Sequence, residues 1–290
     1  MDDLTLDRMA LDDVGANPER LADAIHDQLG RRSGPVPVRA IARALDILEI
    51  REEPLTNIEG ALLTTPERGV GSILLNTNSG RRRRRFTLSH ELLHFLNPWH
   101  RPTAPDGFWC SRGDMIESDR KSHSPHRRQE AEANAFAIEL LAPRTQLRSH
   151  ISGGPDLCRV LAISGDFDIS REAAARRYVN LHDGLVAAVF SKDGGFLYAE
   201  WHEGFPWLGL RRGQPLPSPP THPPGHRVSP WDEAAPEDWL SGERAVDLAV
   251  QTLAQSDGYA ITLLHAAESS QDDDGSEDAY DRFSRLHGHR

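Results

Sequence analysis

The first part of the chain shows two different spacings of hydrophobic residues. Residues 19–30 (ERLADAIHDQLG) and 36–47 (VPVRAIARALDI) carry apolar side chains three and four positions apart, which predicts two amphipathic helices. Shorter apolar runs bounded by turn residues follow at 48–50, 60–65 and 71–76. We expect these runs to be strands of a small sheet.

Longer helical patterns come next. The stretch RRFTLSHELLHFLNPWH, residues 84–100, is predicted to be a helix that ends at Asn97-Pro98. In SPHRRQEAEANAFAIELLAP, residues 124–143, Ser124 can cap a helix that stops at Pro143. Residues 156–181 predict two further helices separated by a short turn, the second opening at Ser170, in the shape of a helix-turn-helix module.

The pattern changes again at Gly184. Strands are expected at 184–191, 195–201 and 259–266, a helix at 242–255 (GERAVDLAVQTLAQ) and a loop in the proline-rich stretch 213–225. The polar, charged residues 267–290 are predicted to be disordered. The predicted fold class is α+β, with parts at 18–148, 149–183 (helical), 184–266 (a smaller α/β domain) and 267–290.

Composition narrows the class of function. The chain has 290 residues and a net charge of −11, which argues against a protein whose main role is to grip DNA or an anionic membrane. Its acidic start lacks the basic and apolar segments of a secretory signal, and no run of about 18 apolar residues predicts a membrane span. Cys110 and Cys158 belong to no CxxC pair, so we expect a reducing, cytoplasmic location.

The HELLH sequence within residues 84–100 is the main candidate for chemistry. Residues four apart stand above one another on a helix, so His90 and His94 can direct two imidazoles at one point, with Glu91 on the flank of the same face. Leucines on the other side can pack into the core. The pattern predicts a zinc site, and the alternative is an amphipathic helix with two solvated histidines.

A catalytic zinc normally takes three protein ligands and a water. No third histidine follows at the short HExxHxxGxxH spacing, so we expect a carboxylate from another helix. Glu130 in EAEAN is the candidate, and Asn134, four residues later on the same face, can support it or a ligand histidine. For Glu130 alone, the alternative is an ordinary solvated helix charge.

Together, RRFTLSHELLHFL and EAEANAFAIELLAP resemble the ImmA/IrrE family of zinc metallopeptidases, whose pattern is an FTxAHExxH helix followed by an ExEANxFAxxLLMP helix. The similarity covers roughly residues 18–180. It implies a zincin-like N-terminal domain and a gluzincin-like site, with Zn²⁺ held by His90, His94 and Glu130 and with Glu91 as the catalytic base.

The chain departs from the family pattern in three places. Leu93 stands where the family often has Gly, and Ala142 stands where it has Met. Both changes concern packing and remove no ligand. The loop at 97–124 looks longer than usual, and we expect it to reshape or cover the cleft. A peptide substrate would most simply lie extended along a sheet edge.

Other charged features have simpler interpretations. The run Arg81 to Arg85 is interpreted as a solvated helix start, with nucleic-acid contact as the alternative. His100, His123 and His126 are expected to be surface or loop histidines. The helix-turn-helix-like segment is given a structural or protein-docking role, and DNA binding is not favoured because its second helix carries few arginines.

Two hypotheses of function follow. The first is a cytoplasmic zinc endopeptidase that cleaves a regulatory protein, which the family resemblance implies to be a helix-turn-helix repressor of stress or mobile-element genes. The second is a non-proteolytic regulator with a structural zinc site, which acts by binding a partner protein or DNA. The intact HELLH favours the enzyme, since a structural site needs no base between its histidines. By analogy with the family, residues 184–266 are expected to sense a signal or dock a substrate.

Overall fold

A computed structural model describes residues 4–30, 32–105, 107–116, 120–218, 228–242 and 246–268. The chain divides into two compact units, which are described separately. The first comprises residues up to 146 together with 166–170, and the second comprises 147–165 and the residues from 171 onward. The finer division predicted from the sequence stays a prediction.

The first unit begins with three helices and a four-stranded sheet. The helices are α1 (Arg8–Val14), α2 (Pro18–Leu29) and α3 (Val38–Ala44), and the strands are β1 (Ile47–Glu53), β2 (Gly60–Thr64), β3 (Gly71–Asn76) and β4 (Gly107–Cys110). The strand order is β1-β3-β2-β4, with β1 parallel to β3 and β2 antiparallel to both its neighbours. The two predicted helices and three predicted strands are confirmed. Strand β4 lies in the segment that the sequence predicted only as a long loop.

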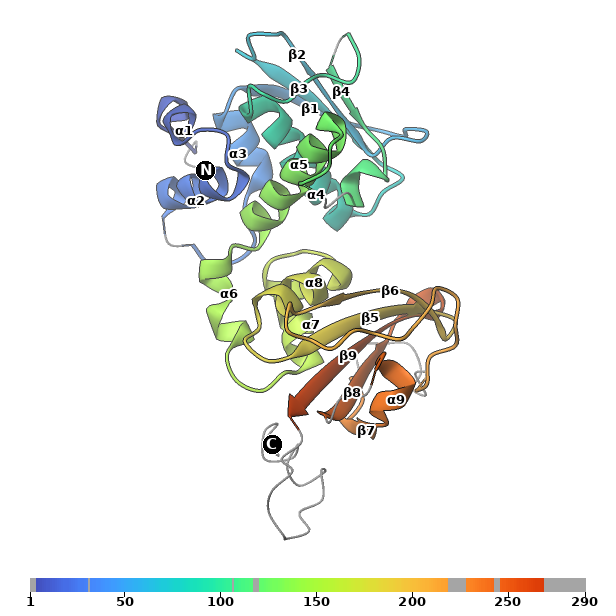
Figure 1. Cartoon of the computed structure of the whole chain (residues 1–290). Coiled ribbons are helices and arrows are strands. Elements are labelled where there is room, and N and C mark those ends of the chain that lie inside the picture. Colours follow the sequence, from blue (N-terminus) through green and yellow to red (C-terminus); the bar gives the residue numbers. More distant parts are fainter. Residues whose placement is uncertain are drawn as a thin grey trace. The chain divides into compact units, whose positions relative to one another are not determined.

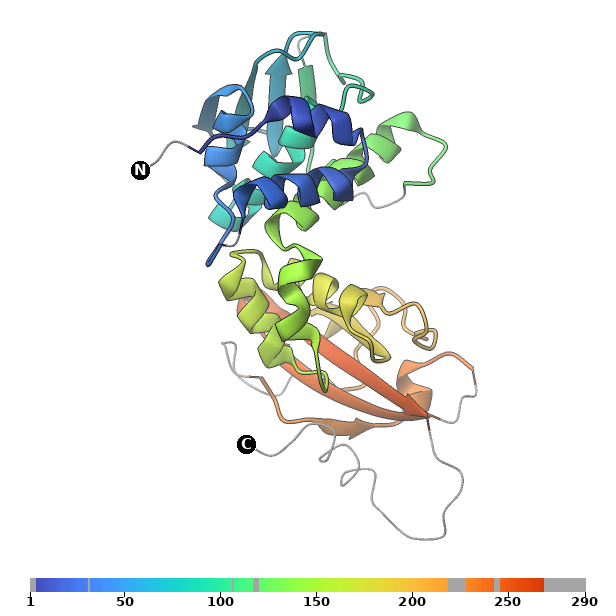
Figure 2. The same cartoon turned by 90° about the vertical axis from the view of Figure 1, so that its left-hand side faces the viewer.

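Two longer helices pack against each other and the sheet. Helix α4 (Arg81–Leu96) contacts β2, β3 and α5 (Pro125–Leu141), and α5 also contacts α2 (Figure 1). Figure 2 shows α2, in blue, in front of the green α5. The predicted N-cap of α5 is confirmed, because the Ser124 side chain accepts a hydrogen bond from the Arg127 backbone N–H. The predicted end of α4 at Asn97 is confirmed as well.

The second unit contains a five-stranded antiparallel sheet. Its strands are β5 (Val186–Lys192), β6 (Gly195–Trp201), β7 (Asp232–Ala234), β8 (Val246–Ala254) and β9 (Tyr259–Glu268), in the order β6-β5-β9-β8-β7. Helices α7 (Leu157–Asp166) and α8 (Arg171–Leu181), which confirm the prediction for 156–181, accompany the sheet (Figure 1). Trp239 of the short helix α9 (Pro236–Trp239) is buried in a cluster with Ala187, Leu248 and Leu264. Helix α6 (Arg144–Ile151) was not predicted.

The predicted helix at 242–255 is wrong, because residues 246–254 form strand β8. Val246, Val250 and Leu253 fit a helical spacing, yet Val246, Leu248 and Val250 also alternate as a strand requires. All nine residues of β8 pair with β9, and this non-local pairing decides between the two periods. The predicted tail is corrected at 267–268, which belong to β9. Its remainder and residues 219–225 of the proline-rich stretch lie outside the described residues.

No helix in the described part of the chain is both long and apolar enough to cross a membrane. Cys110 and Cys158 are both free, Cys110 buried and Cys158 exposed.

Candidate metal centre

The predicted ligand residues come together between α4 and α5. His90 Nε2 lies 3.1 Å from Glu130 Oε2 and 3.1 Å from His94 Nε2. His94 Nε2 lies 3.5 Å from the same Glu130 oxygen. All three side chains are buried, with exposed fractions of 0% for the histidines and 1% for Glu130. The alternatives of solvated histidines and a solvated glutamate therefore do not describe this structure.

These spacings fit a zinc ion. Zinc bonds to nitrogen and carboxylate oxygen are about 2.0–2.2 Å long, so tetrahedral ligand atoms stand about 3.4 Å apart. Burial lowers the pKa of His94 to about 3, which keeps its imidazole neutral. Burial alone would raise the pKa of Glu130, but hydrogen bonds from His90 and His94 outweigh it and hold this pKa well below its usual range. A neutral imidazole and an ionised carboxylate are the forms that bind a metal.

A second layer of contacts fixes the two imidazoles. Asn134 Oδ1 lies 2.9 Å from His90 Nδ1. On the other side, His94 Nδ1 lies 2.8 Å from His100 Nδ1, and His100 Nε2 lies 3.0 Å from Glu132 Oε2. In this arrangement the Glu132 carboxylate contacts His100, and His100 contacts His94. Such contacts orient the imidazole ring that faces the metal and increase its basicity.

His100 lies in the loop after α4, as expected, but it is not at the surface, because it is only 3% exposed. It follows the end of α4, and the buried Arg68 donates hydrogen bonds to the carbonyls of Asn97 and His100. Sequence offers no signal for this contact, which depends on how the chain turns after Asn97. His123 is exposed as expected, and the half-exposed His126 has Nε2 3.7 Å from Glu130 Oε1.

Replacing His100 by alanine is expected to weaken zinc binding by about 10–100-fold, because His94 loses the partner of its Nδ1. Zinc affinity measured by competition with a chromophoric chelator checks this. His123→Ala is the matched control, since that histidine is exposed and should leave the affinity unchanged. Equal affinities for the two variants would contradict a supporting role for His100.

Glu91 is buried beside the ligands. Its exposed fraction is 0%, and neither carboxylate oxygen has a hydrogen-bond partner of normal geometry among the described residues. Burial raises the pKa of Glu91 well above its usual range. An interaction with the neighbouring Cys110 thiol lowers this pKa, but by less than burial raises it. The carboxylate faces β2, because a Cβ added to Gly60 would lie 3.0 Å from Glu91 Oε1.

The absence of a side chain at Gly60 lets β2 approach α4 closely. An added Cβ would also lie 2.4 Å from Thr87 Cγ2, so Gly60→Ala is expected to lower the free energy of unfolding by about 1–3 kcal/mol. Urea denaturation measures this change. Gly69→Ala is the control, because a Cβ there meets no atom within 4 Å. An equal effect at both positions would contradict the close approach.

Residues 45–178 match the model of the peptidase family M78, described as the IrrE N-terminal-like domain. Over these residues the chain is similar to the IrrE N-terminal-like domain. The resemblance to the ImmA/IrrE family and the predicted zincin-like α+β fold are thereby confirmed, with a smaller sheet region at the C-terminal end.

A comparison with solved structures finds a Mycobacterium tuberculosis transcriptional regulator. The match has a TM-score of 0.51 and 13% identity, and it covers 89% of this chain and 80% of that chain. At this identity it shows similarity of fold alone. Comparison with curated protein sequences finds no match.

Strand β4 adds a fourth group to the candidate metal centre. Ligand atoms of His90, His94, Glu130 and Cys110 all lie within 4.8 Å of one another. The Phe108 ring of β4 stacks on His94 with centroids 4.6 Å apart. Sequence analysis missed Cys110, since a lone cysteine in a long loop gives no metal-binding pattern. Only the pairing of β4 with β2 brings it to the site.

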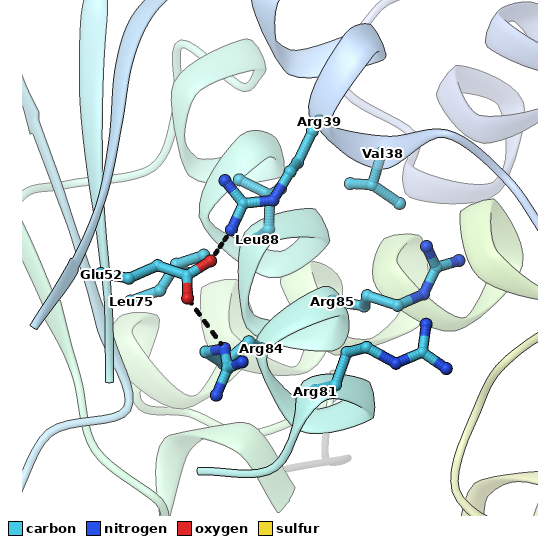
Figure 3. A pocket seen from close by; sticks show the side chains of 8 residues that line it. All are labelled: Val38, Arg39, Glu52, Leu75, Arg81, Arg84, Arg85 and Leu88. Carbon is cyan, nitrogen blue, oxygen red and sulfur yellow. Dashed lines mark ion pairs between the residues drawn. The ribbon is translucent and has the colours of Figure 1, made fainter. Parts of the chain in front are cut away.

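The first unit also has an arginine-rich pocket of about 300 Å³, shown in Figure 3 and lined by Val38, Arg39, Glu52, Leu75, Arg81, Arg84, Arg85 and Leu88. Glu52 pairs with Arg39 and Arg84. Asp168, which groups with this unit, pairs with Arg81, Arg82 and Arg85. The prediction of a solvated run holds for Arg81, whose side chain is 70% exposed, and fails for Arg85 at 19%. These ion pairs anchor the first turns of α4.

Proposed function

We propose that this chain is a zinc-dependent endopeptidase that cleaves a regulatory protein. The observation that carries the proposal is a cluster of His90, His94 and Glu130, spaced to hold a metal ion, with the fully buried carboxylate of Glu91 beside it. A purely structural zinc site would gain nothing from this further buried carboxylate, because burying an ionisable group destabilises the fold.

Each residue has a distinct role in this proposal. His90, His94 and Glu130 hold the zinc, which when bound polarises the scissile carbonyl and acidifies a water. Glu91 accepts the proton of the attacking water and delivers it to the leaving amine. Burial raises the pKa of Glu91, which makes it a stronger base than an exposed carboxylate. Asn134 holds His90 in place through Nδ1.

The proposed substrate is a transcriptional repressor of the helix-turn-helix class, in a stress or mobile-element response. Two observations support a regulatory target: the IrrE N-terminal-like domain and the fold shared with a protein titled a transcriptional regulator. DNA contact by α8 is not favoured, since Arg176 pairs with Glu200 and Arg177 is buried. We propose docking of the substrate protein as the role of the second unit.

The test is cleavage of proteins from a lysate of the source cells, read by labelling newly formed N-termini. The zinc-loaded protein should create a small set of new termini, and the same protein stripped by a chelator should create none. Restoring zinc should restore the same termini. Identical termini with and without zinc would contradict a zinc-dependent peptidase.

A further inference from the structure

Strand β4 covers one edge of β2, the strand that runs beside the candidate base Glu91. Gly60 of β2 pairs with Cys110 of β4, and Gly60 is also the residue that faces Glu91. An extended peptide that added to this edge of β2 would run antiparallel to it beside Glu91, which is the place an endopeptidase needs for its substrate. The protein's own residues 107–110 occupy that place. This edge of β2 is therefore covered.

The site is closed around this strand. His90, Glu91 and His94 are each 0% exposed, so a substrate peptide bond cannot reach them in this conformation. The strand is four residues long. It is held by its pairing with β2, by the fully buried Phe108 and, just beyond it, by the Asn134 side chain, which donates to the carbonyl of Asp114 over 2.8 Å. Its separation from the sheet therefore has to be driven, and the binding of a substrate or partner protein can supply that free energy.

Cys110 brings a metal-binding atom into the closed site. Its Sγ lies within 4.8 Å of the ligand atoms of His90, His94 and Glu130, whereas a zinc site with one sulfur needs about 3.6 Å. A shift of about one ångström would complete four-coordination. Cys110 forms no disulfide, so the sulfur is available.

We propose that the thiolate of Cys110 is a fourth, displaceable zinc ligand and that β4 is an internal substrate mimic which keeps the peptidase latent. This inference rests on the proposed function. In binding zinc, the Cys110 thiol would lose its proton to the solvent, and its sulfur would fill the position that the attacking water needs. Separation of β4 from β2 frees this position and uncovers the edge for a substrate.

Cobalt substitution tests the ligand without any measure of activity. Because the chain has two cysteines, Cys158→Ser leaves Cys110 as the sole thiol. The cobalt-loaded wild type and Cys158→Ser should both show the intense near-ultraviolet absorption of a sulfur-to-cobalt charge transfer, and Cys110→Ser should lack it. Absence of the band in the folded, cobalt-loaded Cys158→Ser protein overturns the proposal. This conclusion holds even if Cys110→Ser fails to fold, because it depends only on the Cys158→Ser protein.

Cleavage tests the inhibitory role separately. Cys110→Ala should cleave the substrate protein faster than wild type, while binding zinc at least about 10-fold more weakly. Both proteins are measured at saturating zinc. If wild type cleaves the substrate and Cys110→Ala cleaves it no faster, the proposal that β4 keeps the peptidase latent is wrong. If the cobalt band is present and neither protein cleaves, the proposed peptidase function fails while the fourth ligand is supported. The exposed Cys158→Ser variant should cleave like wild type.

Discussion

His94→Ala and Glu130→Ala are each expected to abolish stoichiometric zinc binding, whereas wild type should bind about one zinc per chain. Each change removes one of three protein ligands whose metal-facing atoms stand 3.1–3.5 Å apart. The helix ligands that remain cannot replace the lost atom, because they are fixed on rigid helices, and Cys110 takes a position of its own at the metal in the proposal above. Metal analysis after dialysis against a weak chelator gives the stoichiometry.

Thermal unfolding provides a second measurement of the same loss. A ligand at 100 times its dissociation constant stabilises a folded protein by about 2.7 kcal/mol, so added zinc should raise the melting temperature of wild type. The melting temperatures of His94→Ala and Glu130→Ala should not change when zinc is added. His123→Ala is the control, because this exposed histidine lies in the loop before α5 and should respond like wild type. Full zinc retention in both ligand variants would show that the metal centre is assigned to the wrong residues.

The metal-facing residues could be predicted because each pair lies on one helix. The spacing of His90 and His94, and that of Glu130 and Asn134, fixes which side chains share a face before any tertiary contact is known. His100 and Cys110 could not be predicted in this way. Their approach depends on the turn after Asn97, held by Arg68, and on the pairing of β4 with β2.

The same distinction between local pattern and non-local pairing explains which elements of the fold could be predicted. Helices α2, α4 and α5 were predicted from local periodicity and capping, which their tertiary contacts reinforce. Strand β8 was predicted to be a helix because its apolar residues satisfy both periods, and its partner β9 is what makes it a strand. Strand β4 is too short for alternation to identify it. Local sequence therefore determined the ligand helices, and non-local pairing determined what covers the site.

The base of the proposed reaction allows the enzyme to be distinguished from a binding protein. Glu91→Gln should retain zinc and the fold, because Glu91 is not one of the three predicted ligands and the amide has nearly the same shape. Replacing a fully buried ionisable carboxylate by a neutral amide should not destabilise the protein. Cleavage should fall by about 10²–10⁴-fold, since the amide cannot accept the proton of the attacking water.

The measurement pairs a gel of the substrate protein with a reporter of its regulatory effect in cells, each run with wild type and Glu91→Gln. Glu67→Gln, a change of the same chemistry at an exposed position, is the matched control and should behave as wild type in both. Zinc content is measured on every sample, so a loss of metal cannot be mistaken for a loss of the base. If Glu91→Gln regulates normally beside an uncut partner, the protein acts by binding and the peptidase proposal is wrong. A partner cut by wild type and Glu67→Gln only, with regulation lost in Glu91→Gln, would mean that the regulatory effect requires the proton transfer made by this one carboxylate.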